Sequence, residues 1–540
     1  MGSAVAPGAR MPRLFRSLAF VLCLSCAAAG AAAAPWQGRV FDDRDGDGAW
    51  SAGEPGIAGV LVSDGRSIAR TDDEGRYRLQ ARAGRPVFVV KPAGWQLPRR
   101  EDGLPASWHA PLAGDMAPPD ADFALQRGGP RANGSLSVLV FADPQVKSMV
   151  DVDYYARDIV DPLRAGGAQG ADLGISLGDI VDDAVALYPG INAVTTRLGL
   201  PWLHVPGNHD FDPDADADDG SLSAFQASYG PDTFAWEEGG AVFLMLDDVV
   251  LQPGQRPAYV GGLREDQFAF LEAWLPTVPK DRLLVLGLHI PLFDTAAPGR
   301  PETFRSADRE RLFALLRGFP KLLVLSGHRH TQRQYRHGPA EGWHGEVPLH
   351  EFNVGAASGA FWSGAPDAEG IPDATMADGT PNGHALLEVD ADGGYRLSWH
   401  PARVPADDPA RTQAMHLHAP RVLRRGAYPA WAVYANVYMG EPDTRVEYRV
   451  AGGEWRPMVR VERADPWLTA ENARDDEATA LRGYDRSPEA EPSLHLWRGA
   501  LPTRLDVGEH AIEVRAFDRW HGEQRASTRY RLEEQVLPTD

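Results

Sequence analysis

The segment SLSVLVFADPQ (residues 135–145) is the first of six short apolar runs that each end in polar residues. The other five are ADLGISLGDIVDD (171–183), LPWLHVPGNHD (200–210), AVFLMLDD (241–248), RLLVLGLHIPL (282–292) and KLLVLSGHRH (321–330). Helical patterns such as DQFAFLEAWL (266–275) lie between several of these runs. Short apolar strands that alternate with helices predict an α/β fold whose sheet is buried on both faces. In open sheets of this kind, polar residues that follow the strand ends form the binding site.

The regions on either side of this central part have β-strand patterns. Between residues 36 and 126, runs such as GVLVSDG and RPVFVVKP are separated by Gly and Asp turns, which predicts a small antiparallel sandwich. The C-terminal part returns to β patterns, for example VYANVYMG and RVEYRV. We therefore predict three domains: an N-terminal β-sandwich over 35–127, an α/β domain over 135–403 and a C-terminal β domain over 405–540.

Residues 1–34 have the pattern of a signal peptide. Three arginines precede an apolar run and an Ala-rich stretch, and no acidic residue occurs before Asp42. The apolar run is shorter than the roughly 20 residues that span a bilayer. We therefore predict a periplasmic or secreted protein with no transmembrane helix in its mature chain. A lipid attached at Cys26 is a less favoured alternative.

Composition restricts the classes of partner. The formal net charge of -21 at pH 7 opposes a nucleic-acid scaffold or an anionic membrane surface as the main partner. It does not exclude phosphate substrates, because bound divalent cations reverse the local field in a metal site. Both cysteines, Cys23 and Cys26, fall within the signal sequence, so the mature protein is expected to fold without a disulfide.

Five polar motifs follow the apolar runs, in the order DPQ, GDIVD, GNHD, HIP and GHRH. Their carboxylate, amide and imidazole groups are ligands suited to Mn, Fe or Zn. A carboxylate that bridges two such ions holds them about 3.5–4 Å apart, and ions at that spacing clamp a phosphoryl group during in-line displacement. The candidate ligands are Asp143, Asp179, Asn208, His289, His328 and His330.

The order of these motifs resembles that of the calcineurin-like metallophosphoesterase superfamily, whose pattern is D-x-H, GDxxD, GNH[DE], H and GHxH. The resemblance covers roughly residues 137–400. PNGH (381–384) and SLHLWRGALP (493–502) also resemble stretches of a bacterial subgroup with N-terminal and C-terminal β domains. The resemblance implies a central αββα sandwich of two sheets with flanking all-β domains. It also implies hydrolysis of phosphate mono- or diesters by a metal-bridging hydroxide.

The resemblance assigns a role to each matching residue. The first ion would be held by Asp143, Gln145, Asp179 and His330, and the second by Asp179, Asn208, His289 and His328. His209 would face the substrate and protonate the leaving oxygen or stabilise the charged transition state. Asp210 would orient the imidazole of His209, while Asp182 is expected to hold loops or ligands.

Gln145 departs from the family pattern, which has His at this position. An amide oxygen is a harder and weaker donor than imidazole, so the change favours Mn or Mg over Zn. Relatives such as manganese-dependent ADP-ribose and CDP-alcohol hydrolases resemble this chain in having Gln there. We therefore predict two divalent ions, with Mn favoured and Fe, Zn or Mg as alternatives. In another interpretation, Gln145 turns away from the metal and bonds only the backbone.

A second metal-binding pattern lies in the N-terminal region. The sequence D-x-D-x-D-G-x₅-E, formed by Asp43, Asp45, Asp47 and Glu54, matches a calcium-binding loop. No helical pattern precedes it, so an EF-hand is not predicted. The loop is either a structural calcium site or a solvated acidic turn.

Other features leave alternatives open. The substrate is a small phosphate ester or a phosphorylated compound of the cell envelope, and a non-catalytic envelope-binding protein that keeps its metals for structure is the alternative function. The intact GNHD motif opposes that alternative. Arg305 and Arg329 could contact phosphate. Trp362, Asp378 and Asn382 either line the substrate entrance or belong to a connection. Core packing or a sugar-binding face would each explain the C-terminal tryptophans Trp431, Trp455, Trp467, Trp497 and Trp520.

Overall fold

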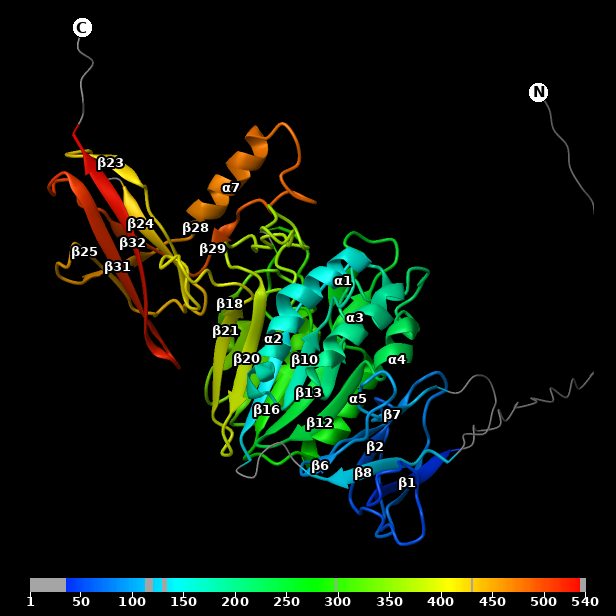
Figure 1. Cartoon of the computed structure of the whole chain (residues 1–540). Helices are drawn as coiled ribbons and strands as arrows, with labels where there is room; N and C mark the ends of the chain where they lie inside the picture. The colour runs from blue at the N-terminus through cyan, green and yellow to red at the C-terminus, as the bar shows by residue number, and fades with distance from the viewer. Residues whose placement is uncertain (1–34, 112–119, 129–133, 297–298, 429–430, 535–540) are drawn as a thin grey trace, which may run out of the picture.

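The computed structural model describes residues 35–111, 120–128, 134–296, 299–428 and 431–534. These residues form a central α/β region with a β region at each end (Figure 1). The predicted signal peptide, including both cysteines, lies outside the described residues. No helix within the described ranges has the length and apolar character needed to cross a membrane.

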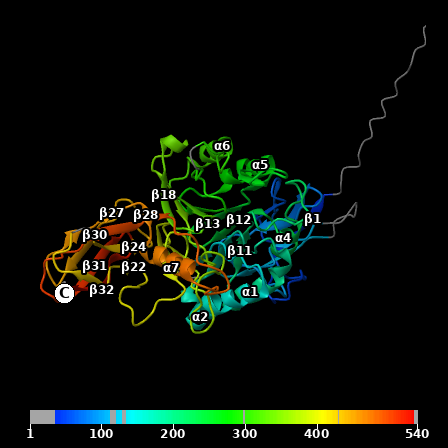
Figure 2. The ribbon, with the colours of Figure 1, turned by 90° about the horizontal axis from the view of Figure 1, so that it is seen from above.

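The central region contains two sheets packed against each other, with helices on both outer faces (Figure 2). The strands of the first sheet, in order, are β11 (Trp202–Val205), β10 (Leu173–Leu177), β9 (Leu136–Phe141), β20 (Gly383–Val389) and β21 (Tyr395–Pro401). Those of the second are β12 (Thr233–Glu238), β13 (Ala241–Leu246), β16 (Leu283–Gly287), β17 (Leu322–Ser326), β19 (Leu349–Asn353) and β18 (Arg333–His337). The predicted αββα sandwich is confirmed.

The alternation of side chains along β9 explains how its sheet is buried on both faces. Val138 and Val140 belong to the apolar core that joins the two sheets, whereas Leu139 and Phe141 pack toward the outer helices. Successive side chains of a strand point to opposite faces, so a continuous apolar run fits a strand covered on both sides.

Two groups of helices cover the sandwich. Figure 2 places α5 and α6 on one side and α1 and α2 on the other. The α-helices of the central region are α1 (Met149–Tyr155), α2 (Asp161–Ala165), α3 (Tyr188–Thr195), α4 (Ser223–Tyr229), α5 (Glu265–Trp274) and α6 (Ser306–Leu316). A short π-helical segment, Ala156–Val160, joins α1 to α2, and β14 (Val249–Leu251) pairs with β15 (Tyr259–Gly261).

The N-terminal region forms two four-stranded sheets around a small apolar core. Its strands are β1 (Trp36–Asp42), β2 (Leu61–Ser63), β3 (Ile68–Arg70), β4 (Arg76–Leu79), β5 (Val87–Val90), β6 (Trp95–Gln96), β7 (Trp108–His109) and β8 (Phe123–Arg127). Buried Lys91 pairs with Glu238 of the central region at 2.5 Å, and Arg82 pairs with Asp266 at 2.6 Å. These ion pairs fix the sandwich against the second central sheet and α5.

The C-terminal region contains a four-stranded and a five-stranded sheet. Its strands are β22 (Met415–His418), β23 (Val422–Arg424), β24 (Ala432–Val437), β25 (Val446–Val450), β26 (Arg456–Pro457), β27 (Val459–Arg460), β28 (Arg463–Ala464), β29 (Pro492–Ser493), β30 (Leu496–Ala500), β31 (Gly508–Asp518) and β32 (Gly522–Glu533). A helix that we did not predict, α7 (Pro466–Glu477), interrupts them. Asp465 caps it and Pro466 starts it, but few of its residues are buried, so its apolar periodicity is weak.

Candidate metal centre

All the predicted metal ligands follow strands whose carboxyl ends lie at one edge of the sandwich. Strands β9, β10 and β11 run parallel in the first sheet, and β16 and β17 run parallel in the second. The loops after these strands carry, in chain order, Asp143 and Gln145, Asp179, Asn208, His289, and His328 and His330. The fold therefore brings residues from both sheets to one place, as expected for α/β sites.

Five of the predicted ligands have left-handed backbone conformations. The φ values are 46° for Asp143, 41° for Gln145, 47° for Asp179, 74° for His328 and 47° for His330. Such conformations are uncommon for residues other than glycine and cost of order 1–3 kcal/mol each. Their concentration in the ligand loops indicates that the surrounding structure holds these side chains in place for function.

The second half of the centre, formed by Asn208, His289 and His328 with Asp179, is closely gathered. The Nε2 atom of His289 lies 3.1 Å from Asn208 Oδ1, 3.2 Å from Asp179 Oδ2 and 3.2 Å from His328 Nδ1. The other ring nitrogen of His289 donates to the Leu177 carbonyl at 2.8 Å. That bond orients the ring and leaves Nε2 free to bind a metal, which is the usual arrangement of a ligating histidine.

The first half, formed by Asp143, Gln145 and His330 with Asp179, is less tightly gathered. His330 Nδ1 donates to the Gly359 carbonyl at 2.7 Å, and its Nε2 lies 3.6 Å from Asp143 Oδ1. Gln145 is 2% exposed, and its Oε1 has no hydrogen-bond partner. Its Nε2 donates to Asp182 at 3.3 Å rather than to the backbone. A buried amide oxygen without a partner is costly, so this atom fits a metal ligand.

Burial and neighbouring charges act differently on the two carboxylates of the centre. Burial raises the pKa of Asp143 to about 8. Burial also acts to raise the pKa of Asp179, but the nearby imidazoles, led by His289, hold it well below its usual range. Asp143 accepts the backbone N–H of His328 at 3.0 Å, and Asp179 accepts that of His209 at 2.8 Å. Two buried carboxylates so close together need positive charge, which divalent ions would provide.

His209 lies beside Asn208 at the partly exposed side of the centre. Its Nδ1 is 2.9 Å from Asp183 Oδ1 and 3.2 Å from Asp182 Oδ1. Burial acts to lower the pKa of His209, but Asp179, Asp183 and Asp182 together raise it. The prediction that Asp210 orients this imidazole is wrong, because Asp183 and Asp182 occupy that place.

Asp210 instead links two ligand loops through hydrogen bonds. Its fully buried carboxylate accepts the backbone N–H groups of Gly207 at 2.8 Å and Ile180 at 3.2 Å, and the Tyr188 hydroxyl at 3.0 Å. Burial raises the pKa of Asp210 to about 7. The backbone turn of the GNHD motif points Asp210 inward while His209 faces the opening. The sequence shows that the two residues are neighbours but not that their side chains point in different directions.

Other residues of the centre were not identified from the sequence. Asp248 is buried after β13 and accepts the backbone N–H groups of His289 at 2.9 Å and Ile290 at 3.2 Å. Tyr259 meets the ring of His328 edge-on at 5.8 Å, and Phe361 stacks on His330 at 4.5 Å. The acidic run after GDIV offered a signal for Asp183, but no motif marked the others.

The segment after the last metal motif connects the central and C-terminal regions. The backbone N–H of Gln332 donates to Asp378 at 2.8 Å, and Asp378 lies 3.1 Å from His495 of the C-terminal region. Trp362 donates to the Pro144 carbonyl at 2.9 Å and Asn382 to Asp158 at 2.8 Å. Because Trp362, Asp378 and Asn382 are buried and bonded in this way, the structure favours the connecting role over the entrance.

The acidic loop in the N-terminal region brings three of its four predicted ligands together. Asp43, Asp45 and Glu54 each place a carboxylate oxygen within 4.8 Å of the others, whereas Asp47 lies outside this group and accepts the Ala49 N–H at 2.8 Å. The carboxylates of Asp43 and Glu54 also accept backbone N–H groups of the loop. The geometry is compatible with a cation but also with a self-bonded acidic turn.

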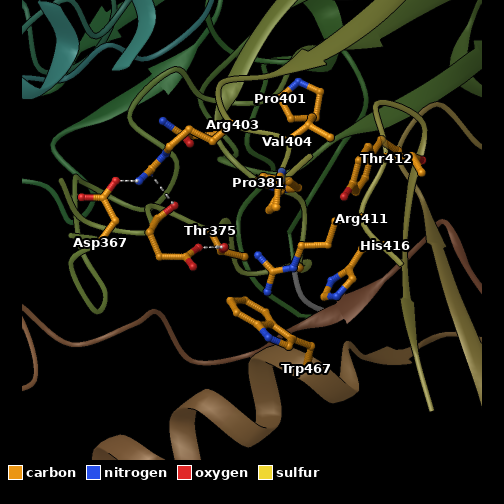
Figure 3. Close-up of a pocket in the computed structure, with 15 residues that line it drawn as sticks. Asp367, Thr375, Pro381, Pro401, Arg403, Val404, Arg411, Thr412, His416 and Trp467 are labelled. Carbon is orange, nitrogen blue, oxygen red and sulfur yellow. Dashed lines mark hydrogen bonds and ion pairs between the residues drawn. The ribbon is translucent and has the colours of Figure 1, made fainter. Parts of the chain in front are cut away.

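The C-terminal tryptophans make separate contacts instead of forming one face. Trp497 is buried in the core of this region, Trp455 packs with arginines, and Trp520 stacks on His350 of the central region. Trp467 lines a cavity of ≈ 220 Å³ at the junction of the two regions, where the guanidinium of Arg411 lies 4.6 Å from its ring (Figure 3). Thr375, Pro381 and Arg403 of the central region face the same cavity (Figure 3).

Comparisons with known proteins agree with the motif pattern. Three family models match in sequence order: "N terminal of Calcineurin-like phosphoesterase" over residues 45–128, "Calcineurin-like phosphoesterase" over 136–332, and "C terminal of Calcineurin-like phosphoesterase" over 351–524. Among curated proteins, none matches the chain.

Solved structures give distant similarities. A dimetal phosphatase from Danio rerio is 14% identical, covers 50% of this chain and 96% of its own, and has a TM-score of 0.34. A purple acid phosphatase from yellow lupin (Lupinus luteus) is 12% identical, covers 64% of this chain and 67% of its own, and has a TM-score of 0.36. The family assignment therefore depends on the family models and the motifs, which support a metal-dependent phosphoesterase. The chain belongs to the calcineurin-like phosphoesterases that carry both an N-terminal and a C-terminal region beside the central one.

Proposed function

We propose that this chain is an exported enzyme that hydrolyses phosphate mono- or diesters with two divalent metal ions. The observation that carries the proposal is the convergence of Asn208, Asp179 and His328 on the Nε2 atom of His289, at 3.1–3.2 Å. Four donors of this kind, on four different loops and with no Lys or Arg among them, have the chemistry of a transition-metal site. The unpartnered Gln145 Oε1 supports a second ion on the other side of Asp179.

The protein residues at this centre have different roles. Two bound divalent ions would activate water and neutralise charge on the phosphoryl group. Asp179 lies between the two ligand sets, and its low pKa keeps it ionised over the working pH range. Asp248 and Asp210 fix the loops through backbone N–H groups, so the ligands are held in position before substrate arrives.

His209 is placed to assist the leaving group. Its Nδ1 faces Asp183 and Asp182, so its Nε2 is the nitrogen that remains for the substrate. The surrounding carboxylates raise the pKa of His209 against the effect of burial, which favours the protonated imidazole. A protonated imidazole beside the centre can donate that proton to the departing oxygen.

Manganese is the ion we propose for the first half. Its protein donors are the Asp143 carboxylate, the Gln145 amide oxygen and one imidazole from His330, which is a harder set than that of the second half. Fe, Zn and Mg are the alternative ions for this half. The substrate we propose is a small phosphate ester or a phosphorylated envelope compound in the periplasm or outside the cell, and the motivation for this location is the signal-peptide pattern of residues 1–34.

The test is hydrolysis by the metal-free protein after separate addition of Mn²⁺, Zn²⁺, Fe²⁺ or Mg²⁺. We expect activity on p-nitrophenyl phosphate, bis-p-nitrophenyl phosphate or both, with Mn²⁺ most effective. His209→Asn should lower kcat by about 10²–10⁴-fold while the protein still binds two ions, because the residue moves a proton and holds no metal. If both esters resist hydrolysis with every metal, and His209→Ala binds them as the unchanged protein does, a non-catalytic binding protein is the better description.

A further inference from the structure

A cavity next to the GHRH motif is lined by two arginines, and neither forms an ion pair with a carboxylate of the described residues. The cavity has a volume of ≈ 330 Å³. It is lined by the loop after β16, the segment from Arg329 to Arg333 and the chain leading through β29, together with Asn353 and Asp378. Arg329 stands between the ligands His328 and His330, so this cavity adjoins the metal centre.

Arg333 is held in the cavity wall by aromatic rings. Its guanidinium lies 4.4 Å from the ring of Phe293 and 4.6 Å from that of Tyr335, and the two rings stack at 4.8 Å. Cation–π contacts of this kind orient a guanidinium without using its N–H donors. Burial lowers the pKa of Arg333; Tyr335 and Glu351 act against this shift, and the charge of Arg329 acts with it. The two cations therefore stand near each other in a partly desolvated place.

The acidic residues around the cavity do not pair with these arginines. Within the described part of the chain, no ion pair within 4.0 Å joins Arg329 or Arg333 to a carboxylate. Asp294 accepts N–H groups from Ala296 and Thr303 of its own loop. Asp378 is bonded to His495 and Gln332. Glu491 also lines the cavity, and its carboxylate has no ion pair with either arginine.

We propose that this cavity binds a second anionic group of the substrate, so the enzyme prefers phosphate esters whose leaving group carries a carboxylate or a further phosphate. This inference rests on the proposed function, since the first phosphate must sit at the metal centre. Arg333 is three positions after His330, which limits their Cα separation to about 10 Å along extended backbone. A planar guanidinium with free donors suits a carboxylate or phosphate. One bound anion would also reduce the repulsion between the two neighbouring cations.

The experiment compares esters that differ only at the far end. Straight-chain alkyl phosphates of three to six carbons, ending in methyl, carboxylate or phosphate, are assayed with the Mn²⁺-loaded mature chain. We expect kcat/KM at one chain length to be at least tenfold higher for a charged end than for methyl. The carboxylate and phosphate arms identify which anion is preferred. Arg333→Gln should reduce the preference to about twofold or less, and Arg333→Lys should retain part of it.

Controls separate this inference from the proposed function. Arg317→Gln changes an exposed arginine after α6, outside the cavity, and should leave the preference unchanged. Melting curves of the Arg333 variants show whether they are folded. If methyl-ended esters are hydrolysed as well as charged ones at every length, the second anion site is wrong while the phosphoesterase stands.

If no ester is hydrolysed, the proposed function fails, and calorimetry still decides the inference. The probes are the alkyl bisphosphates. Weaker binding by about tenfold in Arg333→Gln than in the unchanged chain supports the anion site. Equal binding by the two proteins overturns it.

Discussion

The two halves of the metal centre differ in how closely the protein gathers their ligand atoms. In the second half, three donor atoms, from Asn208, Asp179 and His328, lie 3.1–3.2 Å from His289 Nε2. In the first half, His330 and Asp143 are 3.6 Å apart, and the third side chain supplies an amide oxygen. The second half has two imidazoles against one in the first. The comparison predicts that the two halves bind their ions with unequal affinity.

The largest effect is expected from removing His289, the central ligand of the second half. His289→Ala should lower kcat/KM by more than about 100-fold and abolish the tighter metal site, because changes even in residues that merely support a ligand cost 10–100-fold. The measurement combines kinetics with metal analysis of the dialysed protein. His344→Ala, which alters an exposed histidine, is the control. Full retention of two ions in His289→Ala would show that the second half is assigned wrongly.

Restoring the usual histidine in the first half should reduce the inequality. Gln145→His replaces a weak oxygen donor with imidazole, so Zn²⁺ affinity at the weaker site should rise by about tenfold or more and the advantage of Mn²⁺ should shrink. Competition titration of Zn²⁺ against Mn²⁺ measures both changes. If the variant keeps the metal preference of the unchanged chain, Gln145 is not the cause of the difference between the two halves.

The pH dependence of metal binding should distinguish the halves by a smaller effect. Burial raises the pKa of Asp143 to about 8. Burial opposes protonation of His289, but Asp179 raises the pKa of His289 to about 10. Metal ligands must be deprotonated, so Mn²⁺ displaces a proton from each half below pH 8 but only from His289 between pH 8 and 10. Calorimetry in buffers of different ionisation enthalpy should show proton release falling from about two to about one across pH 8. Constant release contradicts this.

The smallest effect concerns the acidic loop far from the centre in sequence. If Asp43, Asp45 and Glu54 hold calcium, chelation with EGTA should lower the melting temperature by a few degrees, because a ligand that binds only the folded state stabilises it. Asp45→Asn should remove the response to calcium. A melting curve that chelation does not change identifies a solvated acidic turn.

The sequence predicted well which residues the fold brings together, because these residues follow parallel strands. Motifs after β9, β10, β11, β16 and β17 must meet at one edge of the sandwich, so the order of motifs was enough to bring them together. The alternation of apolar runs and helices predicted the α/β class, and the resemblance to the family implied the two-sheet αββα arrangement.

Contacts that depend on side-chain direction within a loop were not predictable. Asp210 follows His209 directly, yet it points inward to Gly207 and Ile180 while Asp183 reaches the imidazole. Asp248 accepts the backbone N–H of His289, and His495 bonds Asp378; both partners are distant in sequence. No local pattern therefore marks Asp248 or His495. Helix α7 was missed because a helix with few buried residues lacks the apolar periodicity that predicts one.

Calorimetric titration of Mn²⁺ into the metal-free chain tests the central claim most directly. Calcium is present in excess so that the acidic loop does not contribute. We predict two Mn²⁺ ions per chain with two resolved affinities, of which the weaker is strengthened for Zn²⁺ by Gln145→His and the tighter is lost in His289→Ala. One ion per chain, or two ions of equal affinity that neither substitution separates, would contradict an unequal two-ion centre.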